Sequence, residues 1–297
     1  MSVSIEDLSE GLASCVARAE ASVVGVGAES GLSWTSELVV TSASGLRRCG
    51  QPRDAIDVRL AGGETWTARV LGEDPASDLA VLRVDGGGLK AIAQRAASRV
   101  VRVGEVVTAL ARPGRAIRAS QRIVGLVSDN VPSRRGLVLP RYVEMDRGFP
   151  DGFVGGAIVD ARGELVGVGT DRVIRGADLA LPPAFLSPLV DAIAADGRPR
   201  LGWLGVSVQG VALPERLLSE VPHGRGALVT GVEKDGPAER AGVGLGDVIV
   251  RIDATPIDGA EALLASLRAL AGRDVELVIV RASSVTRLPA TIGARQH

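Results

Sequence analysis

The amino-acid sequence predicts a mostly β protein made of two domains. The chain has 297 residues, and a domain usually has about 100–200. Short apolar stretches recur about every 8–12 residues with Gly, Asp and Pro between them, which is typical of β-sandwiches and β-barrels. The 38 glycines suit the many tight turns of such folds. We expect one domain over residues 1–196 and a second over residues 197–297, joined by the segment Gly197–Gly202.

The first domain is expected to begin with a helix and to continue as strands. Apolar side chains recur near a 3.6-residue period over residues 5–20, which predicts an amphipathic helix. The apolar stretches that follow predict strands at 22–26, 36–41, 55–60, 65–71, 79–84, 106–109, 123–127, 142–145, 156–159 and 164–169. A second helix over residues 183–195 closes this domain.

The second domain is expected to be a small, partly open barrel with one helix packed on it. Its predicted strands are 203–209, 226–233, 247–252, 274–281 and 287–292. A turn is expected at residues 235–238. The helix is expected at residues 259–270, where several leucines fall on one side.

Charge and composition exclude several classes of partner. The 34 basic and 35 acidic side chains give a net charge of -1, which offers no electrostatic basis for binding nucleic acid or an anionic membrane. No apolar run approaches the ~20 residues that span a bilayer. Cys15 and Cys49 lack metal-type spacing and are too few for a disulfide framework, although one bridge between them is possible. We therefore expect no metal and no cofactor.

The first residues contain no basic segment followed by an apolar one, so no secretory signal is visible. This absence leads to the expectation of a cytoplasmic protein. An incomplete N-terminus would instead indicate an extracytoplasmic one.

Several motifs, in order along nearly the whole chain, resemble the HtrA (Deg) family. The segment Asp74–Leu82 matches D-P-x-x-D-L-A-V-L, Leu38–Leu46 stands where the family has V-T-N-x-H-V, and Gly152–Ala157 stands where it has G-N/D-S-G-G-P. Gly226–Pro237 and Gly242–Ile252 resemble a PDZ signature. The resemblance implies a trypsin-like double β-barrel followed by a PDZ domain.

The same resemblance locates a catalytic triad that has lost two of its three members. It places the histidine at Ser44, the aspartate at Asp78 and the nucleophile at Val154, while the chain's two histidines, His223 and His297, lie outside the first domain. Acyl transfer in this class needs a hydroxyl and an imidazole that takes its proton. We therefore expect a pseudoprotease rather than an enzyme, with Val154 packed on apolar neighbours in the former active site.

Other candidate catalytic groups lack partners. Ser42 has no plausible base, Lys90 matches no motif, and Cys49 has no histidine in its domain. The carboxylates of Asp74 and Asp78 are interpreted as turn and strand-boundary groups rather than as an acid–base pair.

The second domain resembles the peptide-binding part of the family more fully. Gly202–Val206 resembles the x-Φ-G-Φ loop, whose backbone N–H groups bind a terminal carboxylate while the peptide adds as a strand. The implied peptide site consists of Leu204, Gly205, Val206, Leu263 and Leu267. The alternative is that these leucines are only core.

Three functions remain open. The first is an inactive binding module, an adaptor or regulator that captures protein C-termini or extended segments. The second is an HtrA-type serine endopeptidase of protein quality control. The third is a non-catalytic subunit in a mixed oligomer with an active paralogue. Family members often form trimers through an aromatic-bearing N-terminal segment, but this chain has no aromatic before Trp34, so a homo-oligomer is possible without being implied.

Overall fold

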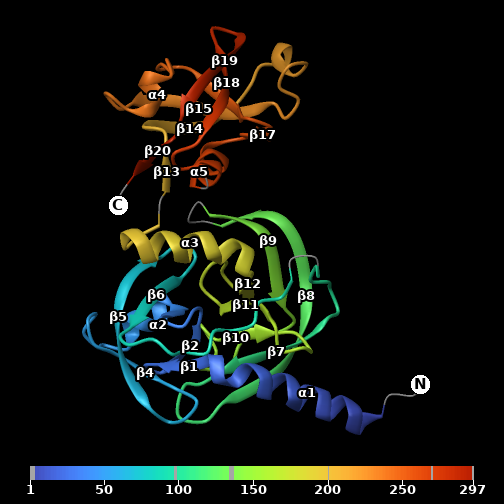
Figure 1. The fold of residues 1–297 in the computed structure, drawn as a ribbon. Helices are drawn as coiled ribbons and strands as arrows, with labels where there is room; N and C mark the ends of the chain where they lie inside the picture. The colour runs from blue at the N-terminus through green and yellow to red at the C-terminus, as the bar shows by residue number, and fades with distance from the viewer. Residues whose placement is uncertain (1–3, 97–98, 134–136, 200, 269, 296–297) are drawn as a thin grey trace. The chain divides into compact units, whose positions relative to one another are not determined.

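The computed structural model describes residues 4–96, 99–133, 137–199, 201–268 and 270–295 (Figure 1). It divides into two compact units, one with residues 1–135 and 139–199 and the other with residues 136–138 and 200–297. In the described residues, no helix is long and apolar enough to cross a membrane.

The first unit begins with helix α1 (Ile5–Ala19), as predicted. Its start is fixed by a capping box, in which Ser4 Oγ accepts from the Asp7 N–H at 3.0 Å and Asp7 Oδ2 accepts from the Ser4 N–H at 3.0 Å. Only its last turns are anchored, because Cys15 and Ala19 are buried there. A 3₁₀ turn, η1 (Glu20–Ser22), leads into the first strand.

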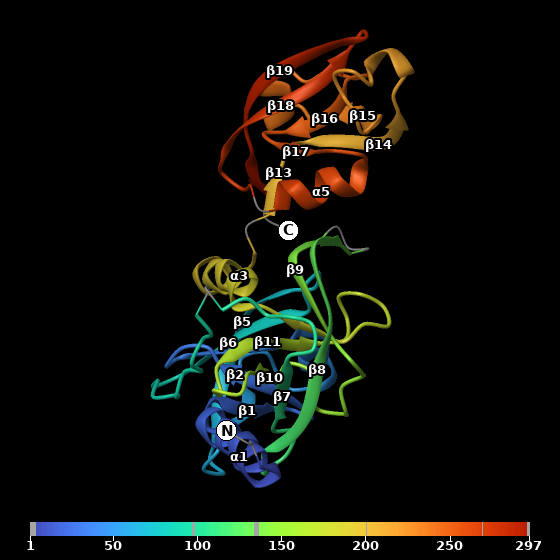
Figure 2. The same cartoon turned by 90° about the vertical axis from the view of Figure 1, so that its right-hand side faces the viewer.

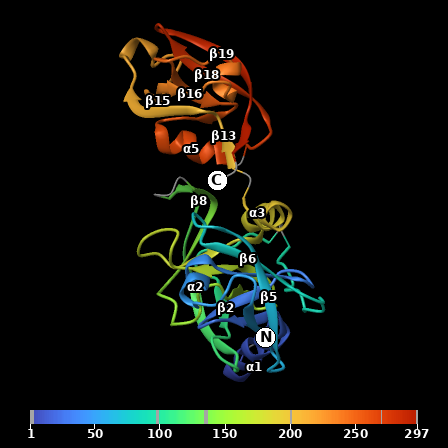
Figure 3. The same cartoon turned by 90° about the vertical axis from the view of Figure 1, so that its left-hand side faces the viewer.

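The first barrel is closed by six antiparallel strands in the order β1-β2-β3-β6-β5-β4. The strands are β1 (Val23–Val26), β2 (Glu29–Ser33), β3 (Leu38–Ser42), β4 (Ile56–Arg59), β5 (Thr65–Asp74) and β6 (Leu79–Val84). Their buried side chains are almost all aliphatic, so Val, Leu, Ile and Ala fill the interior that aromatic residues fill in many proteins. Helix α2 (Ala43–Arg48) follows β3 and packs against β3 and β6 (Figure 3).

The second barrel repeats this plan with the strand order β10-β11-β12-β9-β8-β7. The strands are β7 (Val106–Ala111), β8 (Arg118–Pro132), β9 (Val138–Met145), β10 (Ala157–Val159), β11 (Leu165–Thr170) and β12 (Leu179–Leu181). Figure 2 shows the long strands β8 and β9 side by side along one wall.

Helix α3 (Pro183–Asp196) contacts β5 and β6 of the first barrel and β11 of the second, so it links the two barrels (Figure 1). It ends at Gly197, which has φ 75°. A Cβ on Gly72 of β5 would lie 1.9 Å from the Gly197 carbonyl oxygen, so only glycine allows the helix end to approach this strand.

The second unit is a sheet in the order β14-β15-β16-β18-β19, with β17 paired to β16 and a separate pair β13-β20. The strands are β13 (Leu201–Trp203), β14 (Val206–Ala212), β15 (Arg225–Val232), β16 (Val248–Ile252), β17 (Thr255–Pro256), β18 (Asp274–Arg281), β19 (Ser284–Thr291) and β20 (Gly293–Arg295). Helix α5 (Ala260–Arg268) contacts β13, β14 and β15, while η2 (Glu215–Leu217) and α4 (Pro237–Arg240) lie in the connections.

The predicted double barrel with a second, mainly β domain is confirmed, but some elements differ. Strand β2 and helix α2 were not predicted, residues 237–240 form a short helix instead of a turn, and β8 is far longer than expected. Helix α2 begins because Ser42 Oγ accepts from the Gly45 N–H at 3.0 Å. Cys15 and Cys49 are both free.

Candidate functional site

The first candidate site surrounds Asp78, at the turn before β6. This side chain is buried, with 4% exposure, and its backbone has φ 57°, a conformation that Asp tolerates better than most residues. The Ser44 N–H donates to Asp78 Oδ1 at 2.7 Å. The hydroxyls of Ser42 and Ser44 donate to Asp78 Oδ2 at 2.7 and 3.2 Å. The structure therefore brings Ser44 and Asp78 together, as the resemblance implied.

A further donor comes from the second barrel. Thr170, at the end of β11, donates through Oγ1 to Asp78 Oδ2 at 3.3 Å. We call Ser42, Ser44 and Thr170 the hydroxyl cage of Asp78. With the Ser44 N–H, this cage gives the carboxylate four hydrogen bonds in place of an imidazole.

The loop that carries Val154 lies against the same cage. The Ser30 N–H donates to the Val154 carbonyl at 3.4 Å, and Ser30 Oγ donates to the Gly152 carbonyl at 2.6 Å. A Cβ on Gly155, which has φ 80°, would lie 2.8 Å from the Ser42 backbone nitrogen. The side chain of Val154 is only 9% exposed. The three positions of the implied triad thus belong to one site, formed by both barrels.

At position 154 this site presents an apolar side chain. Valine has no atom that can attack a carbonyl. Among the described residues of this unit, no imidazole lies beside the serine hydroxyls, and acyl transfer by a serine normally needs such a base to take its proton. Asp74 is also committed, because its carboxylate accepts from the N–H and the hydroxyl of Ser77 at 3.2 and 2.7 Å.

The remaining nucleophile candidates lie elsewhere. Cys15 is fully buried beside Thr108, with its Sγ 3.4 Å from Oγ1, and Cys49 follows α2. Lys90 is exposed, beyond β6.

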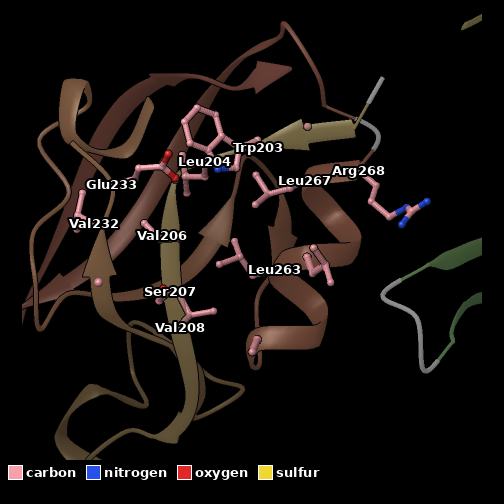
Figure 4. Close-up of a pocket in the computed structure, with 15 residues that line it drawn as sticks. Trp203, Leu204, Val206, Ser207, Val208, Val232, Glu233, Leu263, Leu267 and Arg268 are labelled. Carbon is pink, nitrogen blue, oxygen red and sulfur yellow. The ribbon is translucent and has the colours of Figure 1, made fainter. Parts of the chain in front are cut away.

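The second candidate site is a groove between β14 and α5 (Figure 4). Its cavity has a volume of about 580 Å³ and is lined by all five sequence-predicted peptide-binding residues, Leu204, Gly205, Val206, Leu263 and Leu267. The three leucines have exposures of 1%, 2% and 6%, so they form both the floor of the groove and part of the core.

The backbone of the loop before β14 is oriented by two hydrogen bonds. The carbonyls of Leu204 and Gly205 accept from the N–H groups of Ala238 and Glu233, both at 2.8 Å. A trans peptide unit points its N–H opposite to its carbonyl. The N–H groups of Gly205 and Val206 are therefore directed away from Ala238 and Glu233. Gly205 has φ 79°, which explains the glycine at this turn.

Sequence reasoning missed other groove residues. Trp203, Ser207, Val208, Glu233, Ala260 and Arg268 also line the cavity. The alternation of strand side chains could have found Val208, two positions after Val206. Glu233 follows the neighbouring strand β15, so only the strand register brings it to the groove.

Comparisons with known proteins agree with this architecture. A trypsin-like peptidase domain model matches residues 29–168, and a PDZ domain model matches residues 228–281. A probable periplasmic serine endoprotease, DegP-like, from Ectopseudomonas mendocina is 32% identical over 81% of this chain and 51% of its own. The serine protease Do-like HtrB of Bacillus subtilis is 27% identical over 75% of this chain and 51% of its own. The chain thus spans about half the length of these curated relatives.

Solved structures match over nearly the full chain. The HtrA-type protease AlgW with a decapeptide has a TM-score of 0.73 and 26% identity, covering 96% of this chain and 99% of its own. AlgW with a tripeptide has a TM-score of 0.74 and 28% identity, covering 96% and 98%.

The expectation of a cytoplasmic protein is wrong. Relatives from Ectopseudomonas mendocina, Halomonas elongata and Pseudomonas fluorescens are all named as periplasmic. The expectation relied only on a signal that is not visible in the sequence, and such an absence does not determine a location.

The trypsin-like model covers strands of both barrels, the PDZ model covers the region from β15 to β18 with α5, and the AlgW structure with a decapeptide aligns with 96% of this chain. The chain belongs to the HtrA family, with a trypsin-like peptidase domain followed by a PDZ domain.

Proposed function

We propose that this protein binds peptide segments, above all protein C-termini, in the groove between β14 and α5, and that its trypsin-like domain does not cleave them. The observation that carries the second half is the hydroxyl cage. Ser44 occupies the position of the general base and donates to Asp78, while Val154 occupies the position of the nucleophile.

The expected loss of catalysis is large. In a worked serine-protease example, removing the nucleophile or the base alone lowers kcat by about a million-fold. Here both positions are changed, and no histidine precedes His223. Backbone amides that are aligned for an oxyanion, but have no attacking group beside them, retain only a small part of the catalysed rate.

The groove supplies the chemistry for binding. An extended peptide would add as a strand to β14, which is an edge of its sheet, and its last side chain would enter the apolar cavity. The N–H groups of Gly205 and Val206 would donate to the terminal carboxylate. We expect a micromolar dissociation constant, which corresponds to a binding free energy of about -8 kcal/mol.

A peptide titration tests this half. Full-length protein is titrated with fluorescent peptides that end in an aliphatic residue, either with a free carboxylate or amidated. We expect amidation to weaken binding by about 1.5–3 kcal/mol, the strength of charge-assisted hydrogen bonds. Equal binding of both forms across a library of C-termini would exclude the groove as the functional surface.

The names of the relatives favour a second candidate function, serine endoprotease activity. A fluorophosphonate probe and an unfolded casein substrate separate the two candidates, with the Bacillus subtilis relative as the active control. We expect neither labelling nor cleavage by this protein. Labelling at any residue between Ser22 and Ala195 would instead support serine endoprotease activity. We also infer that the protein acts outside the cytoplasm, as the relatives' names indicate.

A further inference from the structure

The outer face of β14 carries small side chains beside the groove. Val206 and Val208 are half-buried and pack against the core, whereas Ser207, between them, is exposed on the opposite face. Ser207 pairs with Gly231 of β15, and a Cβ on Gly231 would lie 3.3 Å from Ser207 Oγ. Both residues are small, and both are among the residues that line the groove.

The carboxylate of Glu233 lies near the same end of β14 and β15. Glu233 lies two residues after Gly231, and side chains alternate along an extended chain, so positions 231 and 233 are on the same face of the sheet. Its N–H donates to the Gly205 carbonyl, and its Cβ lies 3.5 Å from the position of a Cβ on Gly205. Glu233 is exposed and lines the groove. In Figure 4 its carboxylate lies by Leu204, while the guanidinium of Arg268 points away from the groove.

The segment that contains Glu233 has one more carboxylate than cations. Between residues 233 and 240, three carboxylates face two cations, Lys234 and Arg240. The carboxylate of Glu239 is held by a local contact, because its Oε2 accepts from the Asp235 N–H at 2.6 Å. A terminal carboxylate bound at Gly205 would therefore lie beside another negative charge, which disfavours it unless a cation lies nearby.

The alternation of side chains determines where the peptide can supply that cation. If the last side chain enters the apolar cavity, the penultimate one points to the opposite face, over Ser207. Adjacent strands are about 4.8 Å apart, so β15 is about 10 Å from the added peptide. Of the natural side chains, Lys and Arg reach farthest across such a gap.

We propose that Glu233 selects peptides with Lys or Arg in the penultimate position, before an aliphatic C-terminal residue. This inference rests on the proposed peptide-binding function and names its ligand class. The pair forms at an exposed site, so it changes affinity by about 2- to 5-fold rather than by orders of magnitude.

Fluorescence anisotropy with full-length protein tests the proposal. Three peptides share one aliphatic C-terminus and differ only in a penultimate Arg, Gln or Glu. We expect the Arg peptide to bind about 2- to 5-fold more tightly than the Gln peptide, and the Glu peptide to bind most weakly. Glu233→Gln should remove this order. Glu261→Gln, a carboxylate of α5 that does not line the groove, should preserve it. Raising the salt concentration from about 0.05 to about 0.5 M should reduce the differences in affinity among the three peptides.

Equal binding of the three peptides to wild-type protein, or the same order in Glu233→Gln, would overturn the inference and leave the proposed function intact. Absence of binding by every peptide, free or amidated, would overturn the proposed function and this inference with it.

Discussion

Replacing Asp78 should destabilise the trypsin-like unit, because its buried carboxylate accepts four hydrogen bonds. In Asp78→Ala, the Ser44 N–H and the three hydroxyls lose their common acceptor in a buried site. The hydroxyls can reorient toward one another, but the backbone N–H cannot. An unpaired buried donor costs about 1–3 kcal/mol, and a hydrogen bond to a charged group contributes about 1.5–3 kcal/mol. Because these terms are not additive, we expect a total loss of about 3–4 kcal/mol.

Asp78→Asn refines this prediction. Asparagine tolerates the positive φ of 57°, and its carbonyl can still accept from the Ser44 N–H. Its amide faces hydroxyls that can turn to accept, so only the charge is lost. We expect a loss of about 1–2 kcal/mol.

The assay is urea unfolding followed by tryptophan fluorescence. All variants carry Trp203→Phe, so that the signal comes from the first unit, where Trp34 is 7% exposed. Asp85→Ala, an exposed carboxylate in the same barrel, serves as control and should stay within about 0.5 kcal/mol. An Asp78→Ala protein as stable as this control would refute the claim that the hydrogen bonds of the hydroxyl cage stabilise the unit.

Further predictions concern both units. Val154→Ser should lower stability by about 1 kcal/mol without adding activity, through lost apolar burial and a poorly paired hydroxyl, and an unchanged melting temperature would contradict this packing. Ser44→His combined with Val154→Ser should give weak casein cleavage at best, whereas full activity would show that the surrounding residues still fit a triad. In the PDZ unit, burial raises the pKa of Asp247, but hydrogen bonds from Arg281 and from a backbone N–H outweigh it and keep the pKa below its usual value. Since the folded pKa is depressed, this stabilisation is complete above the unfolded value near 3.9 and is lost as the pH falls through the folded pKa. Arg281→Met should reduce that acid-dependent loss in urea titrations, and an identical pH profile would argue against the pair. Leu204→Arg should abolish peptide binding by blocking the cavity, which anisotropy measures directly.

Local sequence was sufficient to predict most strands of the two barrels, because short apolar stretches recur at regular spacing, whereas the triad positions implied by the resemblance stay a prediction. Local sequence was not sufficient to predict the contacts between residues that are distant in the chain. Thr170 is 92 residues from Asp78 and meets it only because the two barrels pack together. Glu233 reaches the groove only through the register of β15 with β14.

Helix α2 was missed for a local reason. Its sequence from Ala43 to Arg48 contains a serine and a glycine, both weak helix formers, and it is only six residues long. Its stability comes from the Ser42 cap and from packing on β3 and β6, which a propensity argument does not see.

The hydroxyl cage has a consequence for any histidine introduced at position 44. A histidine restored at position 44 would find the Asp78 carboxylate already bound by Ser42 and Thr170, and it would have to displace one of them to receive its own hydrogen bond. A serine restored at position 154 would enter a site without a base and would cost burial. Under the proposed function, each of these two changes made alone would therefore reduce stability without adding cleavage. The hydrogen bonds that make Asp78 useful for folding thus compete with any new partner of its carboxylate.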